Sequence, residues 1–146
     1  MLLLILALLT VQSSSEEFGA IRAFRCDFPE GVGRTAKEGG GLSNLTPEQY
    51  MGLVTHSIDY VGRTALASGA KGTATVAVTV TAGERATSFL MVSTTGNPML
   101  KTIFALPLAR RGADGRTRYF AALSSHGIVN GEAKAQQLYG TCEAVR

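Results

Sequence analysis

The sequence is short of charged residues and of proline, and it lacks the common nucleotide-binding and redox motifs. Charged residues make up 17% of the 146 positions, against about 25% in an average domain, which argues against a charged helical bundle. With four prolines beside 17 glycines, the composition also differs from that of a Pro-rich disordered linker. No P-loop, dinucleotide-binding fingerprint or C-x-x-C motif occurs, so nothing predicts a cofactor.

The charge that is present is slightly basic. The formal net charge of +3 is too small to predict a nucleic-acid partner. The rest of the chain is apolar and rich in glycine, which favours short strands joined by tight turns. A chain of this length can bury roughly two thirds of the surface that its unfolded form exposes, so one domain with a real core is expected.

The apolar run at the start of the chain is too short for a membrane-spanning helix. Met1–Val11 carries no charged side chain and has about half of the ~20 apolar residues that a spanning helix needs. Small and polar residues follow it up to Ser15, which is the layout of a secretory signal, although no Lys or Arg precedes the run. We expect a signal peptide over residues 1–15 and a single domain over 16–146, in a periplasmic or secreted protein. The alternatives are a short membrane anchor and a wrongly assigned start codon.

Only two cysteines are present, and they lie near opposite ends of the expected mature chain. In an oxidising compartment Cys26 and Cys142 are expected to form a disulfide. A bond that closes such a long loop contributes roughly 4–5 kcal/mol in the chain-entropy model. The alternatives are two free thiols or an intermolecular bond.

Period-two alternation predicts about eight short strands. The clearest is Thr73–Thr81, where valines alternate with threonines, because β-branched side chains pack well on a pleated sheet. Cys26 lies on the first expected strand and Cys142 on the last, so these two strands lie close together. This favours an all-β fold, either a small closed barrel of the calycin type or a sandwich. The expected strands cover residues 21–28, 54–60, 64–68, 73–81, 87–93, 99–108, 119–125 and 137–145.

Segments between these strands have signals of their own. Residues 29–42 are rich in glycine and charge and are expected to form a long loop. Thr46 followed by Pro47 and Gln49 has the features of a helix start, so one short helix is expected near 46–53. Asp114-Gly115 predicts a hairpin turn.

The two histidines are the candidates for catalysis or metal binding. His56 and Asp59 are an odd number of residues apart on an expected strand, so they face opposite sides and do not form a metal site. Ser124, Ser125 and His126 supply residue types of a hydrolytic triad, but no G-x-S-x-G motif occurs. We expect no catalytic residue, no metal and no enzymatic activity. The alternative is a small hydrolase or metal-binding protein that uses His56 or His126.

A cluster of arginines is the most function-like feature of the surface. Arg110, Arg111, Arg116 and Arg118 flank one expected hairpin tip, with only Asp114 opposing them. Their guanidinium groups could bind phosphate or carboxylate groups of an anionic envelope component. The other interpretation is a solvated turn that is kept polar for solubility.

Five short pieces occur in an order that marks a family resemblance. The chain resembles a group of small, exported bacterial proteins of uncharacterised function, and the resemblance covers most of the mature chain. It implies export and one disulfide-bonded domain, and it implies no activity. The pieces are Cys26-Asp27-Phe28, Ser57-Ile58-Asp59, Thr102-Ile103-Phe104, Ser125-His126 and Tyr139-Gly140-Thr141-Cys142.

A second resemblance is to the periplasmic inhibitors of C-type lysozyme, which are small barrels with a cysteine near each end. Ser68-Gly69-Ala70-Lys71 is similar to the loop with which those inhibitors enter the lysozyme cleft. It implies that Ser68 and Lys71 contact a hydrolase. The chain departs from that family at Gly72, where the family has an aromatic residue, and it has no tryptophan.

Together these features predict an exported bacterial binding module without enzymatic activity. Its ligand stays open between an anionic envelope component, a small lipophilic ligand and a hydrolase. An apolar interior cavity would favour the small ligand, and a filled core would move the function to the loops.

Overall fold

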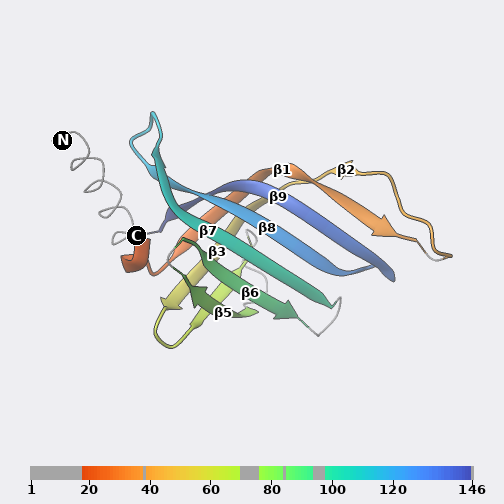
Figure 1. Ribbon diagram of the computed structural model, residues 1–146, viewed down its shortest axis with the longest axis horizontal. Coiled ribbons are helices and arrows are strands. Elements are labelled where there is room, and N and C mark those ends of the chain that lie inside the picture. The colour runs from red at the N-terminus through yellow and green to blue at the C-terminus, as the bar shows by residue number, and fades with distance from the viewer. Residues whose placement is uncertain (1–17, 38, 70–75, 84, 94–97, 146) are drawn as a thin grey trace.

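The computed structural model describes residues 18–37, 39–69, 76–83, 85–93 and 98–145, and its regular structure is almost entirely β-strand. Nine antiparallel strands form one sheet (Figure 1), and a single helical turn covers residues 18–20. The expected all-β class is therefore confirmed. Within the described residues, no helix has the length and apolar character needed to cross a membrane. The strands are β1 (Phe24–Ala36), β2 (Thr46–Pro47), β3 (Tyr50–Asp59), β4 (Thr64–Ser68), β5 (Val76–Ala82), β6 (Thr87–Ser93), β7 (Met99–Arg111), β8 (Thr117–Val129) and β9 (Glu132–Ala144).

The sheet closes into a barrel because its first long strand pairs with its last. β1 pairs with both β3 and β9, so β1 and β3 to β9 form a closed ring, and β2 is an extra strand beside the end of β1. The β1–β9 pairing runs from Phe24 opposite Ala144 to Ala36 opposite Ala133. Closure removes the free edges of a sheet. The structure is thus the closed barrel, and the sandwich alternative is wrong.

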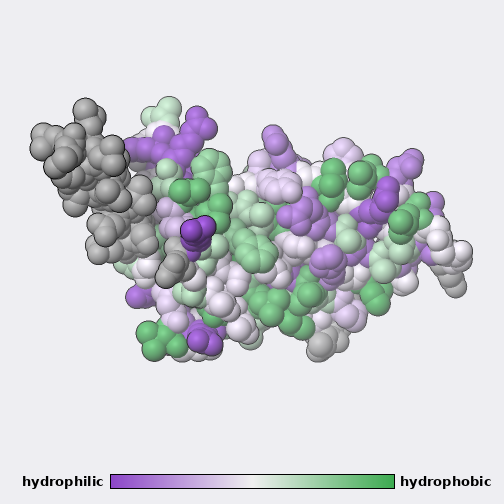
Figure 2. All heavy atoms as spheres, viewed as in Figure 1, coloured by the Kyte–Doolittle hydropathy of each residue, from purple (hydrophilic) through white to green (hydrophobic). Residues whose placement is uncertain are grey.

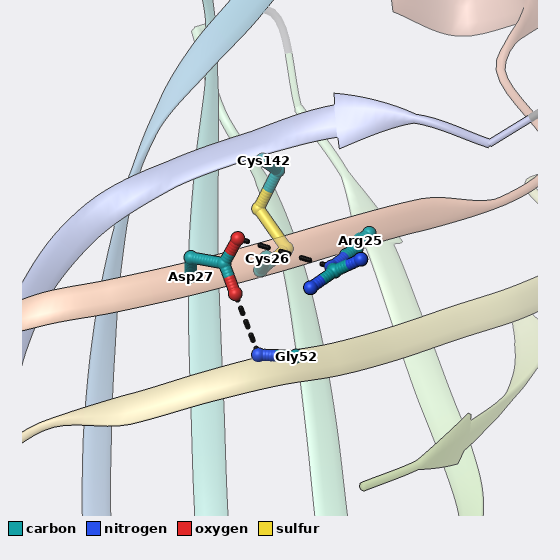
Figure 3. The surroundings of a disulfide bond; sticks show 5 residues. All are labelled: Arg25, Cys26, Asp27, Gly52 and Cys142. Carbon is teal, nitrogen blue, oxygen red and sulfur yellow. Dashed lines mark hydrogen bonds and ion pairs between the residues drawn. A yellow bond between two sulfur atoms is a disulfide. The ribbon is translucent and has the colours of Figure 1, made fainter. Parts of the chain in front are cut away.

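The disulfide lies in this closing seam. Cys26 and Cys142 are direct partners in the β1–β9 register, and they are bonded to each other. Figure 3 shows the bond linking the two strands, while the neighbouring Asp27 turns toward β3. There the Asp27 Oδ1 accepts a hydrogen bond of 2.6 Å from the amide of Gly52. The expected pairing is confirmed, and it is consistent with an oxidising location.

The barrel interior is filled at one end, which we call the sealed end. Phe18 of the helical turn lies 5.2 Å from Phe24 and 4.9 Å from Tyr119, measured between ring centroids. All three side chains are buried, and such tilted and edge-on ring pairs stabilise a core beyond the area they bury. In the expected strand 73–81, the alternating Val78 and Val80 are buried. The core continues inward through Val80, Phe89, Ile103, Leu123 and Leu138.

The prediction of a short helix near residues 46–53 is wrong, because β2 and the start of β3 lie in this segment and pair with β1. Thr46 lies opposite Gly33 and Pro47 opposite Val32. The Thr46 hydroxyl donates to the Gly33 carbonyl, 3.3 Å away, instead of capping a helix. The side chains that cap helices can equally form hydrogen bonds to a neighbouring strand. The pattern at Thr46 is therefore compatible with a helix start and with a strand.

The long loop expected over residues 29–42 is also largely wrong, since β1 continues through it to Ala36. Its glycines permit close approach of other parts of the chain. A Cβ atom on Gly31 would overlap the Gln137 carbonyl oxygen, and one on Gly33 would lie 2.9 Å from the Glu48 side chain.

The alternation of buried and exposed side chains is broken within β3. Thr55 and Ile58 are both buried although they are three residues apart, and His56 between them is half-buried. The register of β3 shifts between His56 and Asp59, where Ser57 has a φ of 54°. An extra residue in a strand changes which side chains face inward.

Candidate functional site

The end of the barrel opposite the sealed end is hollow, and we call this end the mouth. A cavity of about 240 Å³ lies there. Its walls come from five consecutive strands of the barrel, β3 to β7, and most of the lining side chains are apolar. The packed core closes it from the other side. The lining residues are Tyr50, Leu53, Ala67, Ser68, Gly69, Val76, Met91, Ser93, Met99 and Lys101.

Among the described lining residues of this cavity, one carries a charge. Lys101 precedes the buried Ile103 by two residues on β7, so its side chain is directed to the interior. Its cross-strand partners are Met91 and Ser125. The Lys101 Nζ lies 4.2 Å from the centroid of the Tyr50 ring, which is a cation–π contact. Burial lowers the pKa of the Lys101 ammonium, because an apolar environment disfavours its charge.

A second lysine at the same end of the barrel is paired. The Lys134 Nζ lies 2.6 Å from the Glu48 Oε1, and the Glu48 side chain passes over Gly33 to reach it. The hydrogen bond from Lys134 is the main reason why the pKa of the Glu48 carboxyl is lowered from 4.5. Within the described residues, no carboxylate forms an ion pair with Lys101.

We expect the Glu48–Lys134 ion pair to make stability depend on pH. The pKa of the Glu48 carboxyl is lower in the folded protein than its ordinary 4.5. The pair therefore contributes stability that is complete above the unfolded pKa and is lost as the pH falls through the folded pKa. Replacing Glu48→Gln should reduce the loss of stability between pH 7 and pH 3, as measured by denaturant unfolding. The exposed Glu132→Gln is the control, and equal pH profiles for all three proteins would contradict this role.

A second depression lies on the outer surface of the barrel. A groove of about 610 Å³ crosses β7, β8 and β9 and ends at the start of the β1 bulge, near Pro29 and Glu30. Phe104 and Phe120 are each 46% exposed in it, and Tyr139 is 58% exposed. Figure 2 shows apolar side chains mixed with polar ones over these strands. This groove lies on one outer sheet face, whereas the mouth is enclosed by strands.

The four arginines lie on the β7–β8 hairpin at the sealed end, and two of them are neutralised. The Arg118 guanidinium binds both carboxylate oxygens of Asp114, at 3.1 and 2.6 Å. This hydrogen bonding is the main reason why the pKa of Asp114 falls to about 2. Arg116 lies 3.3 Å from the Glu143 carboxylate. Of these four arginines, only Arg110 and Arg111 are exposed without an ion pair to a described residue. The hairpin therefore presents less free positive charge than its four arginines suggest.

The histidines lie on different strands and each has a serine beside it. His56 Nδ1 lies 3.2 Å from the Ser57 Oγ, and His126 Nε2 lies 3.2 Å from the Ser124 Oγ. Ser125 is buried and faces the interior, away from His126. Among the described residues, no three metal-ligating side chains come together.

Sequence reasoning picked out one residue of the mouth and missed the others. Ser68 lines the cavity, whereas Lys71 lies outside the described residues. Lys101 was missed, because the other row of its strand carries the larger apolar side chains. Alternation alone therefore favours that row as the buried one, whereas in the structure Leu100, Phe104 and Leu108 are exposed.

Two family resemblances remain expectations from the sequence. The chain was compared with models of known protein families, with curated sequences and with solved structures, and none of them matches it.

Proposed function

We propose that this chain is a non-enzymatic binding module that takes a small lipophilic ligand into the mouth of its barrel. The cavity at the mouth is the observation that carries this proposal. Ligand sites are typically concave, mostly apolar and provided with few polar groups. The mouth has this composition, because the apolar Leu53, Ala67 and Met91 line it together with Lys101 and Tyr50.

The rest of the barrel is closed and rigid, which supports a preformed ligand site at the mouth. The sealed end is closed by packed aromatic rings, and the disulfide fixes the seam between β1 and β9. A rigid, preformed site loses little conformational entropy when it binds. The disulfide also supports a periplasmic or secreted location, where such bonds persist.

The other candidate functions have less support. A hydrolase based on Ser124 and His126 has no carboxylate to orient the histidine among their register partners, Leu100, Thr102, Ala135 and Gln137. Recognition of an anionic envelope component by the arginine hairpin is weakened by the ion pairs of Arg116 and Arg118.

Methionine methyl groups provide a direct test of the proposed site. Met91 and Met99 line the mouth, whereas Met51 is exposed, at 47%, and is not among its lining residues. The oxidised protein, labelled with 13C at the methionine methyls, should be titrated with 1-octanol and followed by NMR. We expect saturable shifts of the Met91 and Met99 signals and an unchanged Met51 signal.

Two matched substitutions separate the mouth from the outer groove. Ala67→Leu should fill the mouth and abolish the shifts, whereas Ala122→Leu, which lies in the groove, should leave them intact. Thermal melting of both variants checks that they fold. If Ala122→Leu alone abolishes binding, the ligand occupies the groove and the proposed site is wrong. If no methionine signal shifts in a saturable way, the proposal that the protein binds a lipophilic ligand is wrong.

A further inference from the structure

The Lys101 ammonium carries a charge for which the mouth offers little compensation. Burying a charge costs free energy unless the charge is paired. Among the described residues, its one recorded interaction is with the Tyr50 ring. The Glu48 carboxylate at the same end binds Lys134 at 2.6 Å. An anion that entered the cavity would therefore supply the missing partner.

The size and walls of the cavity limit the rest of the ligand. Its volume of about 240 Å³ is below the ~300–1,000 Å³ of sites for drug-sized ligands. Aliphatic and thioether side chains line the same cavity as Lys101, among them Leu53, Val76 and Met91. A compact aliphatic or aromatic body fits these walls better than a polar one.

The number of cationic groups in the cavity indicates whether it suits a singly charged anion or a phosphate dianion. Among the described residues that line the cavity, Lys101 is the one that carries a charge, and an ammonium is a point charge that matches one negative charge. A phosphate dianion is usually held by several donors or by a forked guanidinium. The arginines that could provide one lie on the β7–β8 hairpin, at the sealed end.

From these three observations we infer that the ligand is a small monocarboxylate with an apolar body, whose carboxylate pairs with Lys101. This inference rests on the proposed function and names the ligand class of the same site. Tyr50 then acts as a positioning residue, since its ring holds the ammonium at the mouth.

Octanoate and 1-octanol have the same chain and differ in the head group, so they separate the charge from the apolar contribution. Calorimetric titration of the oxidised full chain should show octanoate binding at least about tenfold more tightly than 1-octanol. Lys101→Met should remove this preference, so that octanoate and 1-octanol bind to the variant with similar affinity. Lys134→Met is the matched control, because it removes a lysine that is already paired, and it should keep the preference.

The outcomes distinguish this inference from the function on which it rests. If octanoate and 1-octanol bind equally to the unmodified protein, or if Lys101→Met weakens both alike, the carboxylate assignment is wrong and lipophile binding stands. If Lys134→Met removes the preference and Lys101→Met does not, the carboxylate pairs with Lys134, and the inference that it pairs with Lys101 is wrong. If neither compound binds, the proposed function fails as well.

Discussion

The double replacement Cys26→Ala and Cys142→Ala should lower the free energy of unfolding by about 4–5 kcal/mol. The two cysteines are separated by 116 residues, and a link between them restricts the unfolded chain over nearly its whole length. Small domains are stable by only about 5–15 kcal/mol. The double variant should therefore lose a large part of its stability and unfold at a much lower urea concentration than the oxidised protein, as measured by far-UV circular dichroism.

The reduced, unmodified protein is the control for this experiment, because it keeps both sulfur atoms in the core and loses only the bond. We expect it to be nearly as unstable as the double variant. If it instead unfolds at the same urea concentration as the oxidised protein, the bond contributes little and the barrel is held by its packing alone. A reduced protein that is stable beside an unstable variant would assign the effect to lost side-chain volume.

The fold class could be predicted because its signals are repetitive and local. Valine and threonine alternation gave the buried positions Val78 and Val80, and the positions of Cys26 and Cys142 gave the closing strands. Each of these signals depends on the period of a strand, which survives without any knowledge of the partners.

Elements that depend on partners could not be predicted in this way. Gly31 and Gly33 have the composition of a loop, yet they lie in β1 because Gln137 and Glu48 come too close for side chains. The capping pattern at Thr46 was satisfied by a neighbouring strand. In both cases the tertiary context decided between two local structures that the sequence allows equally.

The mouth illustrates the same division for the site. The sequence does not reveal that Lys101 faces the interior, because the opposite row of its strand is the more apolar one. It does not reveal the neighbours of Lys101 either, since Tyr50 and Met91 come from other strands. The arginine cluster, in contrast, was predicted to be a free cationic surface. Clustered charges in a sequence do not reveal the ion pair that Arg116 forms with Glu143 on β9. Charge on a surface becomes meaningful only once its pairing is known.

The seam between β1 and β9 predicts a second large effect on stability, at Gly140 of β9. A Cβ atom at this position would overlap the Asp27 carbonyl oxygen and lie 2.8 Å from the Phe28 Cα. These are backbone atoms of β1, which cannot rotate away as a side chain does. Gly140→Ala should therefore force β1 and β9 apart and destabilise the protein by about 3 kcal/mol or more.

Gly41→Ala is the matched control, since a Cβ atom there would meet nothing within 4 Å. It should change the free energy of unfolding by less than about 1 kcal/mol. Both variants should be measured by urea denaturation in the oxidised state, so that the disulfide holds the seam equally in each. If Gly140→Ala is tolerated as well as Gly41→Ala, the two strands do not approach as closely as described. A large loss at Gly140 alone would show that barrel closure depends on backbone contact at this point as well as on the bond between Cys26 and Cys142.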